Sequence, residues 1–311
     1  MTRATDNKIV LVTQKTRLDE LVHRYNTVEQ ARFYIEHHGG GFDDYAKEHE
    51  TYQSATRQVT TFLESYGRLQ TLDRAHVPNY LFGERDVVIA LGRDGLVANV
   101  LKYLSTQCLI GVNPDPTRWD GVLLPFSPRD LPKIVPETCS GKRPLKAVTL
   151  AEAMLNDGQK LLGVNDLFIG RRTHVSAHYA ISHHGTTENQ SSSGIIVSTG
   201  LGSTGWLKSV LAGARGISRY YGAKKMFQTP AGFAWDAEYL YFTVREPFPS
   251  ASTGADIIFG KIDRGKKLLI TSLMPEDGVI FSDGMEQDFL QFNSGTTAEI
   301  GIAEHKGQLV V

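Results

Sequence analysis

The feature that most constrains the fold is a buried strand that runs through a glycine-flanked turn into a helix. Residues 87–101 read VVIALGRDGLVANVL, where an apolar run ends at the turn 92–95 and helical spacing follows over 96–104. A second apolar strand, CLIGVN, occupies residues 108–113. A strand, a helix and a strand at this spacing predict a βαβ unit, and therefore a parallel sheet flanked by helices.

The segments that precede this unit fit the same α/β class. KIVLVT at 8–13 is typical of a first buried strand, and residues 27–37 and 42–66 have apolar residues at helical spacing. Gly67 is a plausible end for the second of these helices. We expect a domain boundary in the proline-rich stretch 125–143, which has an irregular pattern.

The second half of the chain predicts an all-β, sandwich-like domain with one helix near 205–214. Asn156-Asp157-Gly158 is a turn signal, and the residues just before it, 150–155, fit either a strand or a helix. We expect an α/β phosphate-binding domain over 1–140 and a β-rich nucleotide-binding domain over 141–311, with the last ~20 residues packing back on the first domain. The expected strands are 166–170, 178–182, 194–199, 239–244, 267–273, 278–282 and 297–303.

Composition excludes several classes of protein. The 311 residues carry a formal net charge of −1, which gives no electrostatic reason to expect binding to nucleic acid or to a membrane surface. Cys108 and Cys139 lie far apart in the sequence, which excludes a disulfide scaffold and a thiolate zinc site. No apolar run approaches the ~20 residues needed to span a bilayer, and no signal peptide is evident. We therefore expect a cytoplasmic protein.

The turn at 92–95 is the first candidate functional site. Gly92 and Gly95 allow the backbone to approach a ligand closely, and N–H groups at the start of the next helix favour anions. Asp94 at such a phosphate site can hold Mg²⁺ or accept a proton from an attacking hydroxyl. The alternative is an ordinary strand-to-helix turn with an aspartate near the helix N-cap.

Two further segments carry candidate ligand groups. Residues 194–209 read GIIVSTGLGSTGWLKS, a loop rich in hydroxyls and glycines in which Trp206 can stack on a base. The alternative there is a linker or hairpin turn. Asn165 and Asp166 begin a predicted strand and could contact an adenine edge or ribose hydroxyls, although this pair is also a common turn dipeptide.

The order of these motifs resembles the NAD kinase family, in particular the branch of the mitochondrial-type NAD kinases of animals and its bacterial relatives. The family has an α/β domain followed by a β-sandwich-like domain, with the active site between them. Its motifs appear here as KTR (15–17), GRDG (92–95), GVNPDP (111–116), ND (165–166), FIG (168–170), STGLGSTGW (198–206) and REP (245–247).

The resemblance implies transfer of the terminal phosphate of ATP to the 2′-hydroxyl of the adenosine ribose of NAD, which makes NADP. Asp94 would activate that hydroxyl, and Mg²⁺ would bridge the phosphates of ATP without a metal site built from protein ligands. A homodimer or a higher homo-oligomer is also implied. The residues implied to bind the nucleotides are Gly92, Arg93, Gly95, Asn113, Asn165, Asp166, Thr199, Ser203, Thr204, Trp206 and Ser209.

The chain departs from the family pattern at the phosphate turn. Arg93 stands where the family has glycine, and Leu96 where it usually has threonine. If the position needs a positive φ, Arg93 costs about 1 kcal/mol relative to glycine; otherwise it can point at a phosphate. The alternative functions are a non-catalytic NAD(H)-binding protein and a kinase of another small molecule. A dehydrogenase is disfavoured because no G-x-G-x-x-G follows the first strand.

Overall fold

The computed structural model describes residues 4–222 and 232–311 of the chain. The chain divides into two compact units, which we call unit 1 (residues 1–146 and 308–311) and unit 2 (residues 147–307). Two long strands, β5 (Leu145–Leu155) and β16 (Thr297–Val310), pass from one unit into the other.

Unit 1 is built on a parallel sheet, as the βαβ pattern predicted. Its strands lie in the order β2 (Arg68–Asp73), β1 (Lys8–Thr13), β3 (Val87–Leu91) and β4 (Cys108–Val112). The end of β16 adds a parallel strand next to β4, pairing Leu309 with Leu109. The predicted strands at 8–13, 87–91 and 108–113 are therefore confirmed.

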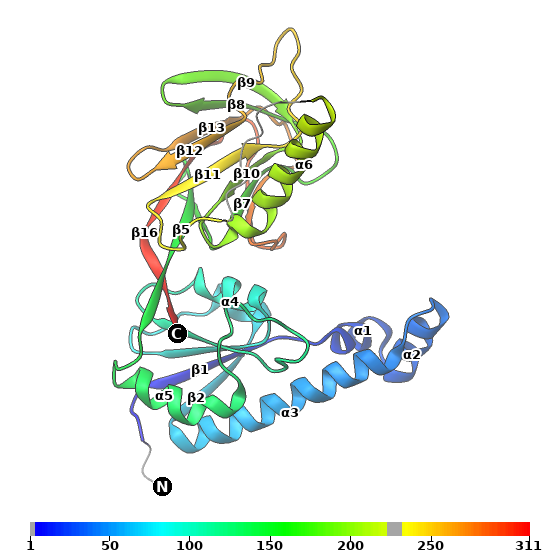
Figure 1. The fold of residues 1–311 in the computed structure, drawn as a ribbon, viewed down its shortest axis with the longest axis vertical. Helices are drawn as coiled ribbons and strands as arrows, with labels where there is room; N and C mark the ends of the chain where they lie inside the picture. Colours follow the sequence, from blue (N-terminus) through cyan, green and yellow to red (C-terminus); the bar gives the residue numbers. More distant parts are fainter. Residues whose placement is uncertain (1–3, 223–231) are drawn as a thin grey trace. The chain divides into compact units, whose positions relative to one another are not determined.

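In unit 1, helices α3 (Phe42–Tyr66) and α5 (Leu131–Cys139) lie on one side of this sheet and α4 (Asp94–Leu101) on the other, whereas α1 and α2 lie away from it, at the far end of α3 (Figure 1). Its long helix α3 has the predicted bounds and buries Tyr52, Val59 and Leu63 in the core. The part of 125–143 that was expected to be irregular is instead helix α5, because Leu131 and Ile134 are buried in the same core. The helices are α1 (Arg17–Tyr25), α2 (Val28–His37), α3 (Phe42–Tyr66), α4 (Asp94–Leu101) and α5 (Leu131–Cys139).

Unit 2 is β-rich and sandwich-like, as predicted. One sheet is antiparallel, with the order β12 (Phe259–Asp263), β11 (Tyr239–Val244), β10 (Ile195–Ser198), β7 (Asp166–Arg171), β14 (Gly278–Ser282) and β15 (Phe289–Gln291). The other strands are β5, β6 (Lys160–Gly163), β8 (Ala177–His183), β9 (Thr186–Ser192), β13 (Leu268–Ser272) and β16.

The core of unit 2 joins residues from both sets of strands. Ile169 of β7 and Phe242 of β11 belong to the same buried cluster as Ile181 of β8 and Ile270 of β13. The predicted helix near 205–214 is confirmed as α6 (Trp206–Tyr220). Residues 150–155, which fitted either structure, belong to β5.

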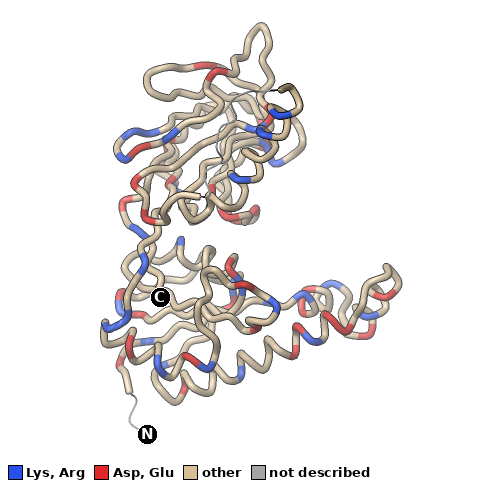
Figure 2. Tube along the Cα trace, in the orientation of Figure 1, with Lys and Arg blue, Asp and Glu red and all other residues tan. Residues whose placement is uncertain are grey.

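Charged residues of both signs are interspersed along each unit of the described chain, in agreement with the net charge of −1 (Figure 2). Within residues 4–222 and 232–311, none of the helices combines the length and the apolar character that crossing a lipid bilayer requires.

Candidate functional site

The glycine-flanked turn of unit 1 lies between β3 and α4. Helix α4 begins at Asp94, two residues earlier than predicted, so Asp94 is in its first turn. A Cβ atom at Gly92 would lie 2.9 Å from Leu96 Cδ2 and 3.1 Å from Gln14 Cδ, so a side chain here would have to displace one of them. A Cβ atom at Gly95 would meet no atom within 4 Å. The open space beside Gly95 lies at the helix N-terminus, where main-chain N–H groups favour an anion.

The carboxylate of Asp94 is half-buried and held on one side. Its Oδ1 atom accepts a hydrogen bond of 2.7 Å from the main-chain N–H of Leu123. The described residues make no hydrogen bond to Oδ2 of Asp94. One oxygen therefore fixes the orientation of the group and leaves the other available to a proton or a ligand.

Arg93 does not adopt the positive φ considered above. Its φ of −114° and ψ of 168° are extended, so no conformational cost arises. Its Nη2 atom donates a hydrogen bond of 2.6 Å to Glu48, and its guanidinium lies 4.3 Å from the ring centroid of Trp119. Arg93 is thus paired with a carboxylate of its own unit.

Asn113, the first residue after β4, is engaged within its own loop. Its Nδ2 atom donates to the carbonyl of Trp119 over 2.9 Å, and its Oδ1 atom accepts from the N–H of Asp115 over 3.0 Å. Both polar ends of this side chain therefore organise the loop that follows β4.

In unit 2, Asp283 organises the pair Asn165 and Asp166. Its carboxylate accepts main-chain hydrogen bonds from Val164 over 3.0 Å and from Asn165 over 2.6 Å. Burial, together with the negative charge of Asp283, raises the pKa of Asp166 to about 7. The described residues make no hydrogen bond to the Asp166 side chain. Sequence reasoning did not select Asp283; the Asp283-Gly284 turn was the available signal.

The loop after β10 is joined to this same pair. Thr199 is buried; its Oγ1 donates a hydrogen bond of 2.6 Å to the carbonyl of Val164, and its main-chain N–H donates to the carbonyl of Asn165 over 3.0 Å. A Cβ atom at Gly202 would clash with that carbonyl of Asn165. The structure thus brings together Asn165 and the 198–205 loop, which the sequence could only treat as separate motifs.

The hydroxyls of the loop differ in their surroundings. Ser203 is buried, donates to the carbonyl of Gly200 over 2.7 Å and accepts from the N–H of Phe233 over 3.2 Å. Ser209 donates to the carbonyl of Gly205 over 3.3 Å in the first turn of α6. Thr204 is exposed. Thr199 and Ser203 therefore hold the loop in shape, and Thr204 faces solvent.

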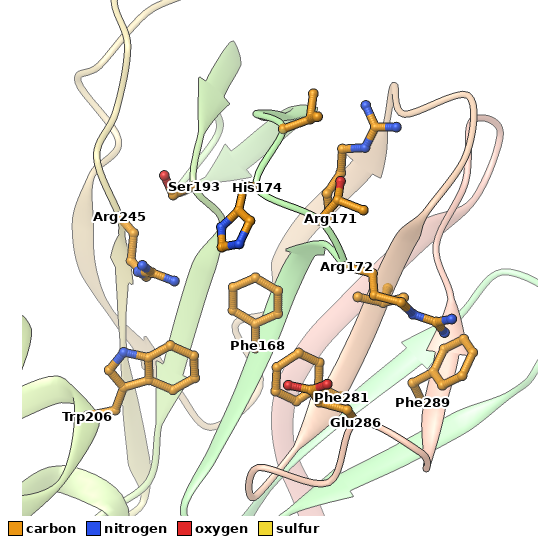
Figure 3. Close-up of a pocket in the computed structure, with 13 residues that line it drawn as sticks. Phe168, Arg171, Arg172, His174, Ser193, Trp206, Arg245, Phe281, Glu286 and Phe289 are labelled. Atoms are coloured by element: carbon orange, nitrogen blue, oxygen red, sulfur yellow. The ribbon is translucent and has the colours of Figure 1, made fainter. Parts of the chain in front are cut away.

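Trp206 borders a cavity of about 310 Å³ in unit 2 (Figure 3). Its ring is parallel to that of Phe168, with centroids 5.8 Å apart, and Phe168 in turn stacks on Phe281 at 4.8 Å. The guanidinium of Arg245 lies 5.5 Å from the Trp206 ring centroid. Planar rings beside a cation suit an aromatic ligand that carries negative charge. Sequence reasoning selected Trp206 but missed the other three residues.

Comparison with known proteins identifies the fold. No model of a protein family matches the sequence, and no curated protein matches it. Among solved structures, yeast NADH kinase complexed with NADH matches with a TM-score of 0.59 and 13% identity, over 99% of this chain and 84% of that chain. An NAD kinase from Archaeoglobus fulgidus in complex with ATP matches with a TM-score of 0.54 and 14% identity, over 97% and 93%. The chain has the two-part fold of these kinases.

Proposed function

We propose that this protein is an NAD kinase, which transfers the terminal phosphate of ATP to the 2′-hydroxyl of the adenosine ribose of NAD and so makes NADP. The observation that carries the proposal is the Asp94 carboxylate at the start of α4, with one oxygen held by Leu123 and the other available. The fold shared with the NADH-bound and ATP-bound kinases supports it.

In this proposal Asp94 takes the proton of the attacking ribose hydroxyl. The N–H groups at the start of α4, beside the open space at Gly95, bind phosphate oxygens. The described residues contain no cluster of three or more histidine, cysteine, aspartate or glutamate side chains suited to a metal ion. Mg²⁺ would be held mainly by the phosphates of ATP, where it would offset their charge.

Unit 2 contributes the groups that recognise the nucleotide. Asn165 and Asp166 bind ribose hydroxyls and the adenine edge, and Trp206 stacks on a base. With a pKa of about 7, Asp166 is both a donor and an acceptor of hydrogen bonds near neutral pH. The ordered motifs further support the mitochondrial-type branch of the family and assembly into a dimer or a higher oligomer, which light scattering of the purified protein tests.

A second candidate is an NAD(H)-binding protein without kinase activity. The observation that favours it is Leu96, which is fully buried and gives the phosphate turn no hydroxyl.

The experiment incubates the purified protein with NAD, ATP and Mg²⁺ and measures NADP, with Asp94→Asn in parallel. We expect NADP from the wild-type protein and a loss of about a hundredfold or more in kcat for Asp94→Asn, because the base that accepts the hydroxyl proton is removed. NAD binding measured by calorimetry should persist in the variant. NAD binding without NADP formation by the wild type would support the second candidate.

A further inference from the structure

The loop that follows β4, residues 113–123, meets the phosphate turn at two points. The main-chain N–H of Leu123 donates to Asp94, and the ring of Trp119 packs 4.3 Å from the guanidinium of Arg93. The loop is also fixed internally, because Asn113 donates to the carbonyl of Trp119. Both contacts therefore join the 113–123 loop to the turn that carries Asp94.

On its other side, Arg93 is fixed by helix α3. The Glu48 carboxylate accepts its hydrogen bond of 2.6 Å and also accepts one of 2.6 Å from Nε of Arg17. Arg118 lies 3.4 Å from the same carboxylate. The side chain of Glu48 is only 8% exposed, and a carboxylate so buried requires such cationic partners. Glu48 is thus a rigid anchor for Arg93.

Arg93 and the loop residue Arg118 therefore both connect the Glu48 carboxylate on α3 to the loop that holds Asp94, and Arg93 does so through the ring of Trp119. An arginine suits this link, because its planar guanidinium can donate to a carboxylate and stack on an indole at the same time. Glu48 shares its single negative charge among Arg93, Arg17 and Arg118, so the pairing directs the Arg93 side chain toward α3 without neutralising it.

We propose that Arg93 is a positioning residue, which acts through Trp119 and the 113–123 loop to keep the Leu123 N–H on the Asp94 carboxylate. The proposal rests on the proposed kinase function, and it gives Arg93 a role other than the phosphate ligand considered from the sequence. It explains how the turn accommodates an arginine in its second position.

The test compares Arg93→Gln and Trp119→Leu with Arg17→Gln, a matched control that also removes a partner of Glu48 but does not contact the loop. Steady-state kinetics give kcat and the KM values for ATP and NAD. Hydrogen exchange at the Leu123 amide, measured by NMR without nucleotide, reports the loop contact independently of activity. Arg93→Lys keeps the charge and loses the planar stacking surface.

We expect Arg93→Gln and Trp119→Leu each to lower kcat by about tenfold with KM values changed by less than about twofold, because a misplaced catalytic group affects mainly the chemical step. Exchange at Leu123 should accelerate in both variants. Arg17→Gln should change both readouts much less than Arg93→Gln does, because Arg17 makes no contact of its own with the 113–123 loop, and Arg93→Lys should recover part of the loss.

Three results would overturn the proposal. A raised KM for ATP with unchanged kcat in Arg93→Gln would make Arg93 a phosphate ligand. An equal loss of kcat in Arg17→Gln would show that the effect comes from the ion pairs around Glu48 and not from Arg93 itself. Unchanged hydrogen exchange at Leu123 in both variants would show that Arg93 and Trp119 do not hold the Leu123 N–H on Asp94. If the wild type makes no NADP, the kinase function fails, and the Leu123 exchange alone decides the positioning role.

Discussion

At the scale of single residues, the protonation of Asp166 is set by its surroundings in unit 2. An isolated aspartate has a pKa of 3.8, whereas burial and the neighbouring carboxylate of Asp283 raise the pKa of Asp166 to about 7. Between these values the folded protein holds a proton that the unfolded chain has released. The free energy of unfolding therefore falls as the pH rises through this window.

Asp166→Asn should remove this pH dependence, because an amide does not ionise. We expect the variant to be more stable than the wild type at pH 8, by up to about 4 kcal/mol, and the gain to be smaller at pH 5. The difference in free energy of unfolding is measured by urea unfolding of unit 2, monitored through the fluorescence of Trp206 and Trp235. Asp157→Asn, in the exposed turn between β5 and β6, is the control and should show no such trend. An equal gain at both pH values would contradict the raised pKa.

At the scale of elements, some boundaries followed from local patterns and others from burial. Helix α3 has the predicted bounds because its apolar residues keep helical spacing up to Gly67. Helix α5 was missed because it contains Pro132 and Pro136, which usually indicate irregular structure. One proline is tolerated in the first turn of a helix, and burial of Leu131, Ile134 and Val135 stabilises the rest.

Gly95, at the start of α4, and Gly200, in the loop after β10, have different structural roles, and substitution by alanine tests this difference. Gly95→Ala should leave stability unchanged or raise it by up to about 1 kcal/mol, because the new methyl group meets no atom of the chain. The same methyl group should raise the KM for ATP if phosphate oxygens occupy that space. Gly200→Ala should instead lower the free energy of unfolding by about 1–3 kcal/mol, because its Cβ would clash with the Ala234 carbonyl.

Thermal unfolding and ATP kinetics of both variants provide the measurement. A Gly95→Ala enzyme with a wild-type KM for ATP would contradict phosphate binding at the start of α4. A fully stable Gly200→Ala would show that the loop after β10 can move away from Ala234.

At the scale of the whole molecule, unit 1 is completed by the last residues of the chain. Leu309 and Val310 are 3% and 1% exposed, and Val310 belongs to the core around β1, β3 and β4. Gln308 and Leu309 also pair with β4 and so cover its edge. The sequence predicted that the end of the chain would pack on the first domain, but nothing local in it singles out these last few residues.

Deletion of residues 308–311 should therefore destabilise unit 1 by about 3–6 kcal/mol, the value of two buried aliphatic side chains. Urea unfolding followed by the fluorescence of Trp119, in unit 1, measures the change. Removal of Val311 alone is the control. It loses one main-chain hydrogen bond to Pro144, so we expect a cost of only about 1 kcal/mol. Equal stability of the four-residue deletion and the wild type would contradict this role of β16.

The sequence by itself determined the βαβ unit, the β-rich second half and the order of the motifs around Asp94, Asn165 and Trp206. These features depend on the spacing of apolar residues and on the positions of glycines, both of which can be recognised within a short segment of sequence. The tertiary structure decided that Asp283 holds the Asn165-Asp166 turn, that Glu48 and Trp119 engage Arg93, and that Leu123 orients Asp94. Those partners lie 26 to 118 residues apart along the chain, as the separations Arg93–Trp119 and Asn165–Asp283 show. Such contacts depend on packing between distant segments, which no local pattern encodes.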